Sequence, residues 1–502
     1  MFTLVEMTMQ QLTNLDASFL HLENDHSPMH VGGVLIFDSP AQGRMTLERL
    51  RKHVSARLQT ARVFRQRVVM PAWHLDAPWW VEDENFSLDN HLRHETVDTP
   101  LTNEGLQEFS AAFFSQRLRR DRPLWELVFV ESASTGRRRA SHKGGAFALL
   151  IKVHHAALDG VSAEAVIAGL LDQDVVPRTL PRDIWLPETP PGQAAMLMRQ
   201  LRTAPAWQAQ GRELLRSAQM LGQRFLQRTV SQGERLLPYY FTAPRTPFNI
   251  PITGERVYGT AELSLPRIKQ LKNRVPGLTV NDVVLAVCAG AVRRYLEDEG
   301  VMPVRSLVAM APISKRNHDQ KKSLGNKVSS MLIRLATDID DPLQRLRQIH
   351  ESARCAKDYS REMTVEALFD QLPHAATAHF LSRYAQGNTA RRMPPMFNMV
   401  ITNVPGSPVP LYLDGAMMRG FTGMAGVFDG MALTMVVLSY RDELSISITS
   451  TPEALRDPQR LIGYMNESLD ELETAVQQAE MTLGIGVGAV LPVVPGSRPP
   501  HL

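Results

Sequence analysis

Residues 146–160 read AFALLIKVHHAALDG, and this stretch joins the clearest strand pattern of the chain to its most distinctive polar motif. An apolar run of this length is typical of a buried β-strand. The strand is expected to end at two adjacent histidines, His154 and His155. Because successive strand side chains point to opposite faces, only one of the two imidazoles can face a given cavity, and we expect the other to be structural.

A histidine at such a strand end can act as a general base, because neutral imidazole has a pKa near physiological pH. It can take the proton of a hydroxyl group as that oxygen attacks a carbonyl, which typically accelerates the step ~10²–10⁴-fold. The hydroxyl can belong to the substrate, so no serine nucleophile is required. The sequence holds no G-x-S-x-G elbow, which argues against an α/β-hydrolase. The residues alone leave open that the pair is an ordinary feature of a strand end.

The turn after the strand carries an acid and a glycine, Asp159 and Gly160. The carboxylate can hold the turn by hydrogen bonds or pair with an arginine, and Gly160 permits a backbone geometry that a β-carbon would forbid. His155 and Asp159 are only two of the three or four ligands that a metal site needs, so we expect no metal. Neither a P-loop nor a dinucleotide fingerprint is present in the sequence.

Predicted strands and helices alternate on both sides of a proline-rich middle, which favours two mixed α/β halves. The strands are expected at Met29–Phe37, Leu124–Glu131, Ala146–His155, Arg256–Leu265, Leu307–Pro312, Met396–Thr402, Met431–Tyr440 and Leu444–Thr449. The helices are expected at Leu106–Arg119, Ser162–Asp172, Asn281–Glu299 and Asp457–Ala479. The predicted division is an N-terminal domain at 1–176, a connector at 177–245, a C-terminal domain at 246–480 and a loose tail at 481–502.

The connector begins with the proline-rich run Pro177–Pro191 and continues into a basic segment. Between Met196 and Val230 six arginines stand against one acidic residue, which gives this segment a charge of +5. Apolar residues at helical spacing predict an amphipathic helix over Trp207–Phe225. Two interpretations stay open: a connector helix packed on the protein with a solvated polar face, or a basic helix lying on an anionic lipid surface.

The composition is that of an ordinary globular protein, with 44% hydrophobic and 21% charged residues among 502. The net charge of +3 is too small for a protein that binds nucleic acid with its whole surface. Two cysteines cannot form a disulfide framework, and the N-terminus lacks the pattern of a signal peptide. No apolar run reaches the ~18 residues of a membrane span. We therefore expect a cytoplasmic protein whose membrane association, if any, is peripheral.

Further motifs accompany HHxxxDG in a fixed order along the chain. They are Leu15-Asp-Ala-Ser-Phe19, Pro28-Met-His-Val-Gly32, Pro123-Leu124-Trp125, Asn281-Asp282, Asn403-Val-Pro405-Gly406 and Leu438-Ser-Tyr440. Together they resemble the bacterial wax ester synthase/diacylglycerol acyltransferase (WS/DGAT) family of the CoA-dependent acyltransferase superfamily. The resemblance extends from about Leu12 to about Asp457.

This resemblance implies two chloramphenicol-acetyltransferase-like α/β domains with a substrate channel between them. It implies an O-acyltransferase that moves a long-chain acyl group from acyl-CoA, a co-substrate, to diacylglycerol or a fatty alcohol, and so makes triacylglycerol or wax ester. No cofactor or metal is expected. The implied partners are these substrates and, peripherally, the inner membrane or a lipid inclusion.

The resemblance also implies roles for individual residues. His155 would be the general base, His154 would flank and orient it, and Asp159 would hold the motif. An amide donor, Asn281, would stabilise the oxyanion. Residues implied in substrate binding are Gly160, Pro123, Leu124, Trp125, Asp282, Asn403, Pro405 and Gly406.

Alternatives remain for several of these positions. Asp282 stands three residues after Thr279, which is the spacing of a capping box at a helix N-terminus. Pro123-Leu124-Trp125 is compatible with plain core packing, and Asn403–Gly406 has the composition of a turn. The chain departs from the family pattern at Ser407, at Thr434 and after Tyr440, which puts substrate preference in doubt. Other functions left open are a condensation-domain-like enzyme that uses carrier-bound acyl groups, and a catalytically silent lipid-binding relative.

Overall fold

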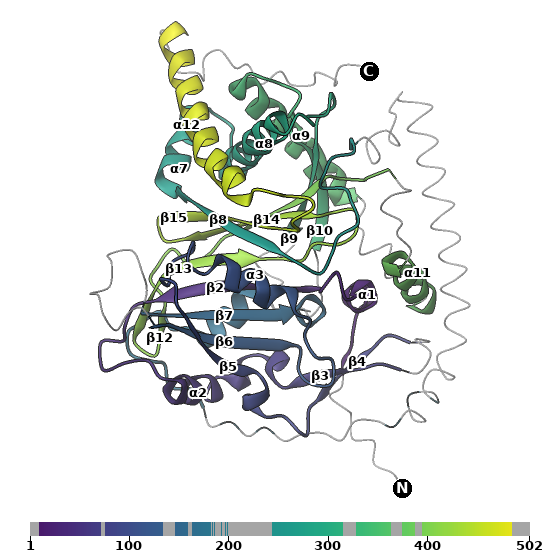
Figure 1. Cartoon of the computed structure of the whole chain (residues 1–502), viewed down its shortest axis with the longest axis vertical. Helices are drawn as coiled ribbons and strands as arrows, with labels where there is room; N and C mark the ends of the chain where they lie inside the picture. The colour runs from purple at the N-terminus through teal and green to yellow at the C-terminus, as the bar shows by residue number, and fades with distance from the viewer. Residues whose placement is uncertain are drawn as a thin grey trace.

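The structure is a computed structural model of the chain (Figure 1). It describes residues 10–71, 76–133, 146–158, 163–181, 243–314, 328–362, 374–386 and 394–483, together with residues 183, 185, 192, 196 and 198. The helices of these described residues include none that is long and apolar enough to cross a membrane.

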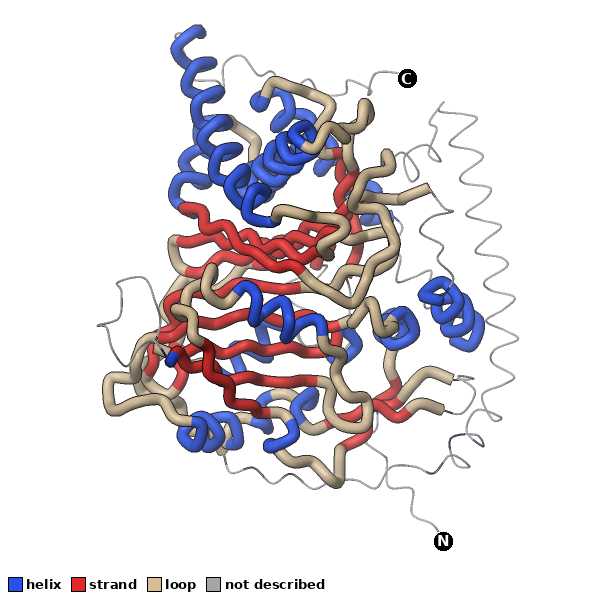
Figure 2. Tube along the Cα trace, viewed as in Figure 1, coloured by secondary structure: helices blue, strands red, loops and turns tan. Residues whose placement is uncertain are grey.

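The molecule has two stacked halves, each built on a six-stranded sheet (Figure 2). The first sheet has the order β12-β13-β2-β7-β6-β5, and only its β5–β6 pair is parallel. Its strands are β12 (Tyr412–Leu413), β13 (Ala416–Met424), β2 (His30–Phe37), β7 (Phe147–His154), β6 (Trp125–Ser132) and β5 (Leu92–Val97). Every residue of the central strand β7 is buried, as its apolar sequence requires.

The second sheet has the order β10-β9-β11-β14-β15-β8, with parallel pairing of β11 to both of its neighbours. Its strands are β10 (Val328–Arg334), β9 (Val308–Ser314), β11 (Met399–Val404), β14 (Leu433–Tyr440), β15 (Glu443–Ser450) and β8 (Val257–Ser264). Helices cover the face of this sheet that points away from the first half (Figure 1); they are α7 (Leu265–Arg274), α8 (Val280–Asp298), α9 (Pro342–Glu362) and α12 (Pro458–Leu483).

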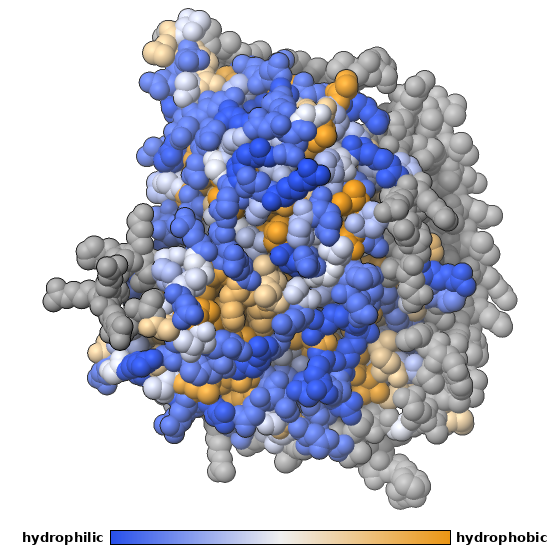
Figure 3. All heavy atoms as spheres, in the orientation of Figure 1, coloured by the Kyte–Doolittle hydropathy of each residue, from blue (hydrophilic) through white to orange (hydrophobic). Residues whose placement is uncertain are grey.

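The remaining described elements surround the first sheet. A small sheet of order β1-β4-β3 stands beside it, formed by β1 (Gln10–Gln11), β4 (Trp79–Glu82) and β3 (Gln66–Val69). The helices are α1 (Asn14–Leu22), α2 (Leu47–Ser55), α3 (Gln107–Ser115), α4 (Ala163–Leu170) and α11 (His374–Gln386). Short 3-10 segments occur at Leu58–Thr60, Arg62–Phe64, Leu88–Asn90 and His155–Leu158. On the face drawn in Figure 3, hydrophilic residues cover most of the described surface, and an apolar patch lies where the two halves meet.

Strand β13 joins the two halves, because residues late in the chain pair with the first strand of the N-terminal sheet. Its residues Met418–Met424 run antiparallel to β2. The close approach needs a glycine: a β-carbon on Gly33 would meet the Phe421 ring at 2.6 Å and the Thr422 carbonyl oxygen at 2.7 Å. The sheets are therefore not divided strictly at the connector, although the predicted division placed residues 246–480 together in the C-terminal domain.

The predicted elements that fall on described residues agree with the structure within a few residues. The strand expected at Ala146–His155 is β7, and the helix expected at Asn281–Glu299 is α8. Gly300 follows that helix with a φ of +68°, a left-handed conformation that favours glycine as a stop. Helix α12 continues to Leu483, into the stretch predicted as a loose tail. The mixed α/β class is confirmed.

Most of the predicted connector, including the basic helix over 207–225, lies outside the described residues. Its described beginning is attached to the N-terminal half. The Pro181 carbonyl accepts a hydrogen bond from Gln59 Nε2 at 2.7 Å, and Trp185 Nε1 donates to Glu82 Oε2 at 2.6 Å. This part of the connector is therefore packed on protein.

Candidate active site

His155 lies at the end of β7, where the strand changes into the 3-10 turn His155–Leu158. Its backbone N–H donates to the Met29 carbonyl at 2.8 Å. Its ring stacks on the ring of Phe19 in α1, with 3.9 Å between centroids and 19° between planes. The residue keeps partial solvent exposure, whereas its Nδ1 atom is buried and has no hydrogen-bond partner among the described residues.

Burial dominates the electrostatics of His155. It lowers the pKa of the imidazole to about 4, with a further lowering by His154, while the residue's own backbone carbonyl acts in the opposite direction. The ring is therefore neutral at pH 7 and can accept a proton.

His154 is fully buried. Its Nδ1 accepts a hydrogen bond from the Ala156 N–H at 3.1 Å, which places the ring proton on Nε2. Nε2 faces the carboxylate of Glu23 at 3.5 Å, an electrostatic contact longer than an ordinary hydrogen bond. Burial is also the main cause that lowers the pKa of His154.

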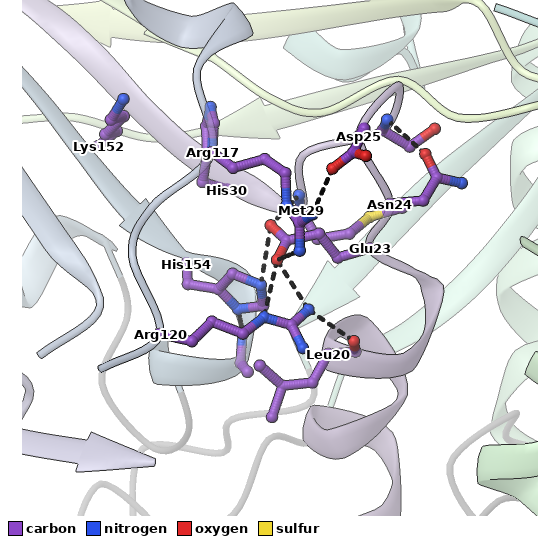
Figure 4. Close-up of polar contacts among 12 residues, drawn as sticks. Leu20, Glu23, Asn24, Asp25, Met29, His30, Arg117, Arg120, Lys152 and His154 are labelled. Atoms are coloured by element: carbon purple, nitrogen blue, oxygen red, sulfur yellow. Dashed lines mark hydrogen bonds and ion pairs between the residues drawn. The ribbon is translucent and has the colours of Figure 1, made fainter. Parts of the chain in front are cut away.

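The carboxylate opposite His154 belongs to a cluster that the motifs did not reveal (Figure 4). Glu23 follows α1 as its C-cap residue, and its side chain is completely buried. It contacts the guanidinium groups of Arg117 and Arg120 and accepts a hydrogen bond from the Met29 N–H. Burial alone would raise the pKa of this carboxyl, but His154 and Arg120 hold it well below its usual range. In the sequence, Glu23 lies between the Leu15–Phe19 and Pro28–Gly32 motifs, and the two arginines come shortly before Pro123-Leu124-Trp125. Charged residues placed so close to the motifs are the signal that could have suggested the cluster.

Two residues of the Pro123-Leu124-Trp125 motif support the histidine strand from its other side. The Leu124 carbonyl accepts a hydrogen bond from the His154 N–H at 2.9 Å. Trp125 is buried, donates from Nε1 to the Phe64 carbonyl at 3.1 Å and stacks on His91. These contacts are with the protein itself and match the packing role left open by the sequence. A contact of Pro123, Leu124 or Trp125 with substrate stays a prediction.

The Asn281-Asp282 motif lies in the first turn of α8. Asp282 forms the capping box with Thr279, and its carboxylate also contacts His350 Nδ1 at 2.9 Å. Asp282 therefore has a structural role here, and its contact with substrate stays a prediction. The oxygen Oδ1 of Asn281 accepts a hydrogen bond from Asn403 Nδ2 at 3.1 Å, so the structure joins two predicted site residues from distant parts of the chain.

The Asn403–Gly406 motif packs on the Leu438-Ser-Tyr440 motif. Gly406 N–H donates to Ser439 Oγ at 3.1 Å. A β-carbon on Gly406 would overlap the Ser439 carbonyl oxygen, so only glycine fits this close approach. Pro405, which precedes it, is exposed.

The predicted site residues thus form two groups. His154 ends β7 of the first sheet and His155 follows it, while Asn281, Asp282, Asn403 and Gly406 belong to the second half. No direct hydrogen bond between the two groups occurs among the described residues. Asp159 and Gly160 lie outside the described residues. Within the part of the chain that the structure describes, no three His, Cys, Asp or Glu side chains converge as a metal site would need.

Comparisons with known proteins agree with the order of the motifs. Residues 12–284 match the model of the wax ester synthase/diacylglycerol acyltransferase catalytic domain, and residues 324–473 match the WS/DGAT C-terminal domain. The chain is 33% identical over 480 residues to the Mycobacterium tuberculosis protein named "Putative diacyglycerol O-acyltransferase Rv3740c", covering 93% of this chain and 100% of that protein. It is 30% identical over 480 residues to the O-acyltransferase WSD of Acinetobacter baylyi, covering 94% of this chain and 99% of that protein.

A comparison with solved structures also finds a wax ester synthase/diacylglycerol acyltransferase. The wax ester synthase/diacylglycerol acyltransferase from Marinobacter aquaeolei VT8 is similar with a TM-score of 0.64 and 29% identity, over 95% of this chain and 100% of that one. The starter condensation domain of rhizomide synthetase, with a TM-score of 0.52 and 12% identity over 94% of this chain and 95% of that one, shares the fold alone. The predicted two-domain acyltransferase fold is confirmed, while a channel between the domains stays a prediction.

Proposed function

The chain belongs to the wax ester synthase/diacylglycerol acyltransferase family, and from this premise we propose that His155 is the general base of its acyl transfer. The protein is an O-acyltransferase of the kind that makes triacylglycerol or wax ester. The observation that carries the proposal is the state of His155, a neutral ring stacked on Phe19 and anchored by its backbone to Met29.

In the proposed reaction, Nε2 of His155 takes the proton of the acceptor hydroxyl while that oxygen attacks the carbonyl carbon of the acyl-CoA thioester. The tetrahedral intermediate collapses, the carbon–sulfur bond breaks, and the leaving thiolate takes the proton from the imidazolium. The imidazolium of His155, with a pKa of about 4, is more acidic than a thiol, whose ordinary pKa is about 8.5. The leaving thiolate therefore takes the proton readily. The products are an ester and free CoA, and no cofactor is needed.

The proposed oxyanion donor is Asn281. Asn403 donates to the amide oxygen of Asn281, which fixes the orientation of the amide and leaves its NH₂ group available as a donor. Asn281 also lies at the N-terminal end of α8, where the helix dipole favours negative charge. In this proposal Asn403, Pro405 and Gly406 form the substrate-facing loop beside it.

The remaining proposed partners are a long-chain acyl-CoA, diacylglycerol or a fatty alcohol, and the surface of the inner membrane or of a lipid inclusion, reached from the cytoplasm. The charge of +5 between Met196 and Val230 supports the surface contact, because basic residues contribute about 1 kcal/mol each near anionic lipid. Sedimentation with anionic vesicles tests it: replacing Arg212 and Arg216 by Glu should weaken binding.

The His155→Ala variant tests the proposed base. Purified protein is incubated with palmitoyl-CoA and either hexadecanol or dipalmitoylglycerol, and the released thiol is measured. We expect a loss of ~10²–10⁴-fold with an unchanged circular dichroism spectrum. A matched control is His94→Ala on β5, since His94 is exposed and pairs with Glu131, and this variant should keep its activity. Full activity of His155→Ala would contradict the proposal.

The same assay separates the other functions. Acyl transfer that occurs only from a carrier-bound thioester would favour a condensation-domain-like enzyme. Lipid binding without thiol release from any donor would favour the catalytically silent relative.

A further inference from the structure

The buried cluster around Glu23 is unusual because a charged carboxylate lies next to the histidine motif without being part of it. Its side chain has no exposed surface. Burying an isolated carboxylate is costly, so such a group is retained only with close partners. Oε2 receives hydrogen bonds from Arg120 at 2.7 and 3.0 Å and from Arg117 at 3.1 Å. These two arginines supply that compensation.

The other carboxylate oxygen is directed at the histidine motif. Oε1 accepts the Met29 N–H at 3.2 Å and faces His154 Nε2 at 3.5 Å. The Met29 carbonyl, in turn, accepts the backbone N–H of His155. One carboxylate therefore holds the residue that anchors His155 and also faces Nε2 of His154, whose proton the Ala156 N–H on Nδ1 places there (Figure 4).

We propose that Glu23 is a positioning residue of the acyl-transfer site: its carboxylate fixes the Met29 backbone that anchors His155 and balances the charge of Arg117 and Arg120 beside the histidine motif. The inference rests on the proposed function, in which His155 is the base.

The charge balance extends over every element packed around the cluster. Asp25 pairs with Arg117 at 2.6 Å, so the two arginines face two carboxylates. His30 is buried beside the cluster, and its pKa is lowered to about 3 chiefly by burial, so it is neutral. Lys152 contacts Glu126 at 3.1 Å and is balanced by it. His154 is neutral for the reason given above. Removing the charge of Glu23 therefore leaves one uncompensated positive charge near His155.

Two variants with opposite charge changes test the inference. Glu23→Gln keeps the size of the side chain and leaves excess positive charge, so it should lower kcat by about 10- to 100-fold with little change in KM, because the base is misplaced and its imidazolium is disfavoured. Glu23→Asp, which keeps the charge, should retain more of kcat than Glu23→Gln. Arg120→Gln leaves excess negative charge, which favours the imidazolium of His155. In a plot of kcat against pH, the fall at low pH (the acid limb) should therefore move to higher pH.

A matched control has the same chemistry away from the site. Asp172 is a buried carboxylate held by Arg57 at 2.6 Å and by Arg178 at 3.4 Å. Asp172→Asn should lower the folded fraction as Glu23→Gln does. It should leave both the kcat of the folded molecules and the acid limb unchanged, since a structural ion pair does not move them.

The outcomes are distinguishable. Equal kcat values for folded Glu23→Gln and Asp172→Asn, or an unmoved acid limb in Arg120→Gln, would overturn the inference. If Glu23→Gln does not fold, the pH of the acid limb of kcat in Arg120→Gln alone tests the inference. Full activity of His155→Ala would instead refute the proposed base. An inactive His155→Ala beside an unaffected Glu23→Gln would refute only the role of Glu23.

Discussion

Removing the ring that covers the base should raise the pH at which activity is lost. Phe19 stacks on His155 at 3.9 Å and shields one face of the imidazole from water. The ordinary pKa of histidine is 6.5, and burial lowers that of His155 to about 4. At 1.36 kcal/mol per pKa unit, the environment therefore disfavours the imidazolium by about 3.4 kcal/mol.

If one ring face accounts for about half of that penalty, Phe19→Ala restores about 1.7 kcal/mol and moves the pKa of the base to slightly above 5. The measurement is the pH profile of kcat/KM for thiol release between pH 4.5 and 8, with circular dichroism recorded at each pH. The wild type should stay on its plateau down to about pH 5. In Phe19→Ala the fall of kcat/KM at low pH should move into the measured range. The plateau at higher pH should also be lower than in the wild type, because the His155 ring is less well fixed.

A control variant separates this effect from a general loss of packing. Phe86 stacks on His91 at 5.4 Å, a histidine outside the proposed reaction, so Phe86→Ala should leave the acid limb where it is in the wild type. A wild-type limb near pH 6.5 would refute the reasoning, because His155 would then be fully hydrated. An unchanged limb in Phe19→Ala would show that Phe19 is not the shielding group.

Two further predictions concern stability and the oxyanion donor. The pKa values of His30 and His155 are lowered to about 3 and about 4, so between pH 7 and 5 these residues take up protons in the unfolded state only, and the free energy of unfolding should fall by about 2 kcal/mol for each. Urea unfolding at the two pH values measures this, and equal or greater stability at pH 5 would contradict it. Asn281→Ala should lower kcat by about 10²-fold or more through loss of the donor, and Asn403→Ala by less, because Asn403 only orients that amide. Equal kcat values for Asn281→Ala and the wild type would exclude the role.

The sequence predicts well where a local pattern decides the structure. Strand β7 follows from an uninterrupted apolar run, and α8 follows from the capping box of Thr279 and Asp282 together with the stop at Gly300. Both patterns depend on residues within one element. The order of the motifs was enough to indicate the family, and the comparisons confirm it.

The contacts that the sequence did not predict join residues far apart in the chain. Strand β13 pairs with β2 across nearly four hundred residues, and its sequence AMMRGFTGM has neither a strong apolar alternation nor a clear turn signal. Glu23 meets Arg117 and Arg120 more than ninety residues away. Both contacts depend on how distant segments meet in the folded chain, which no local periodicity encodes.

The backbone of the two histidines gives a physical reason for the sequence order of three motifs. His154 is the last residue of β7 and His155 follows it. The N–H of His154 donates to the Leu124 carbonyl, and that of His155 donates to the Met29 carbonyl. Each carbonyl lies in the residue just before a neighbouring strand, β6 or β2, and each of those residues belongs to a motif. The histidine pair is thereby held from both sides at the point where the strand ends. We infer that these motifs serve first to fix the strand end that carries the proposed base, because a base that is loose by about 1 Å loses about 10²-fold in rate.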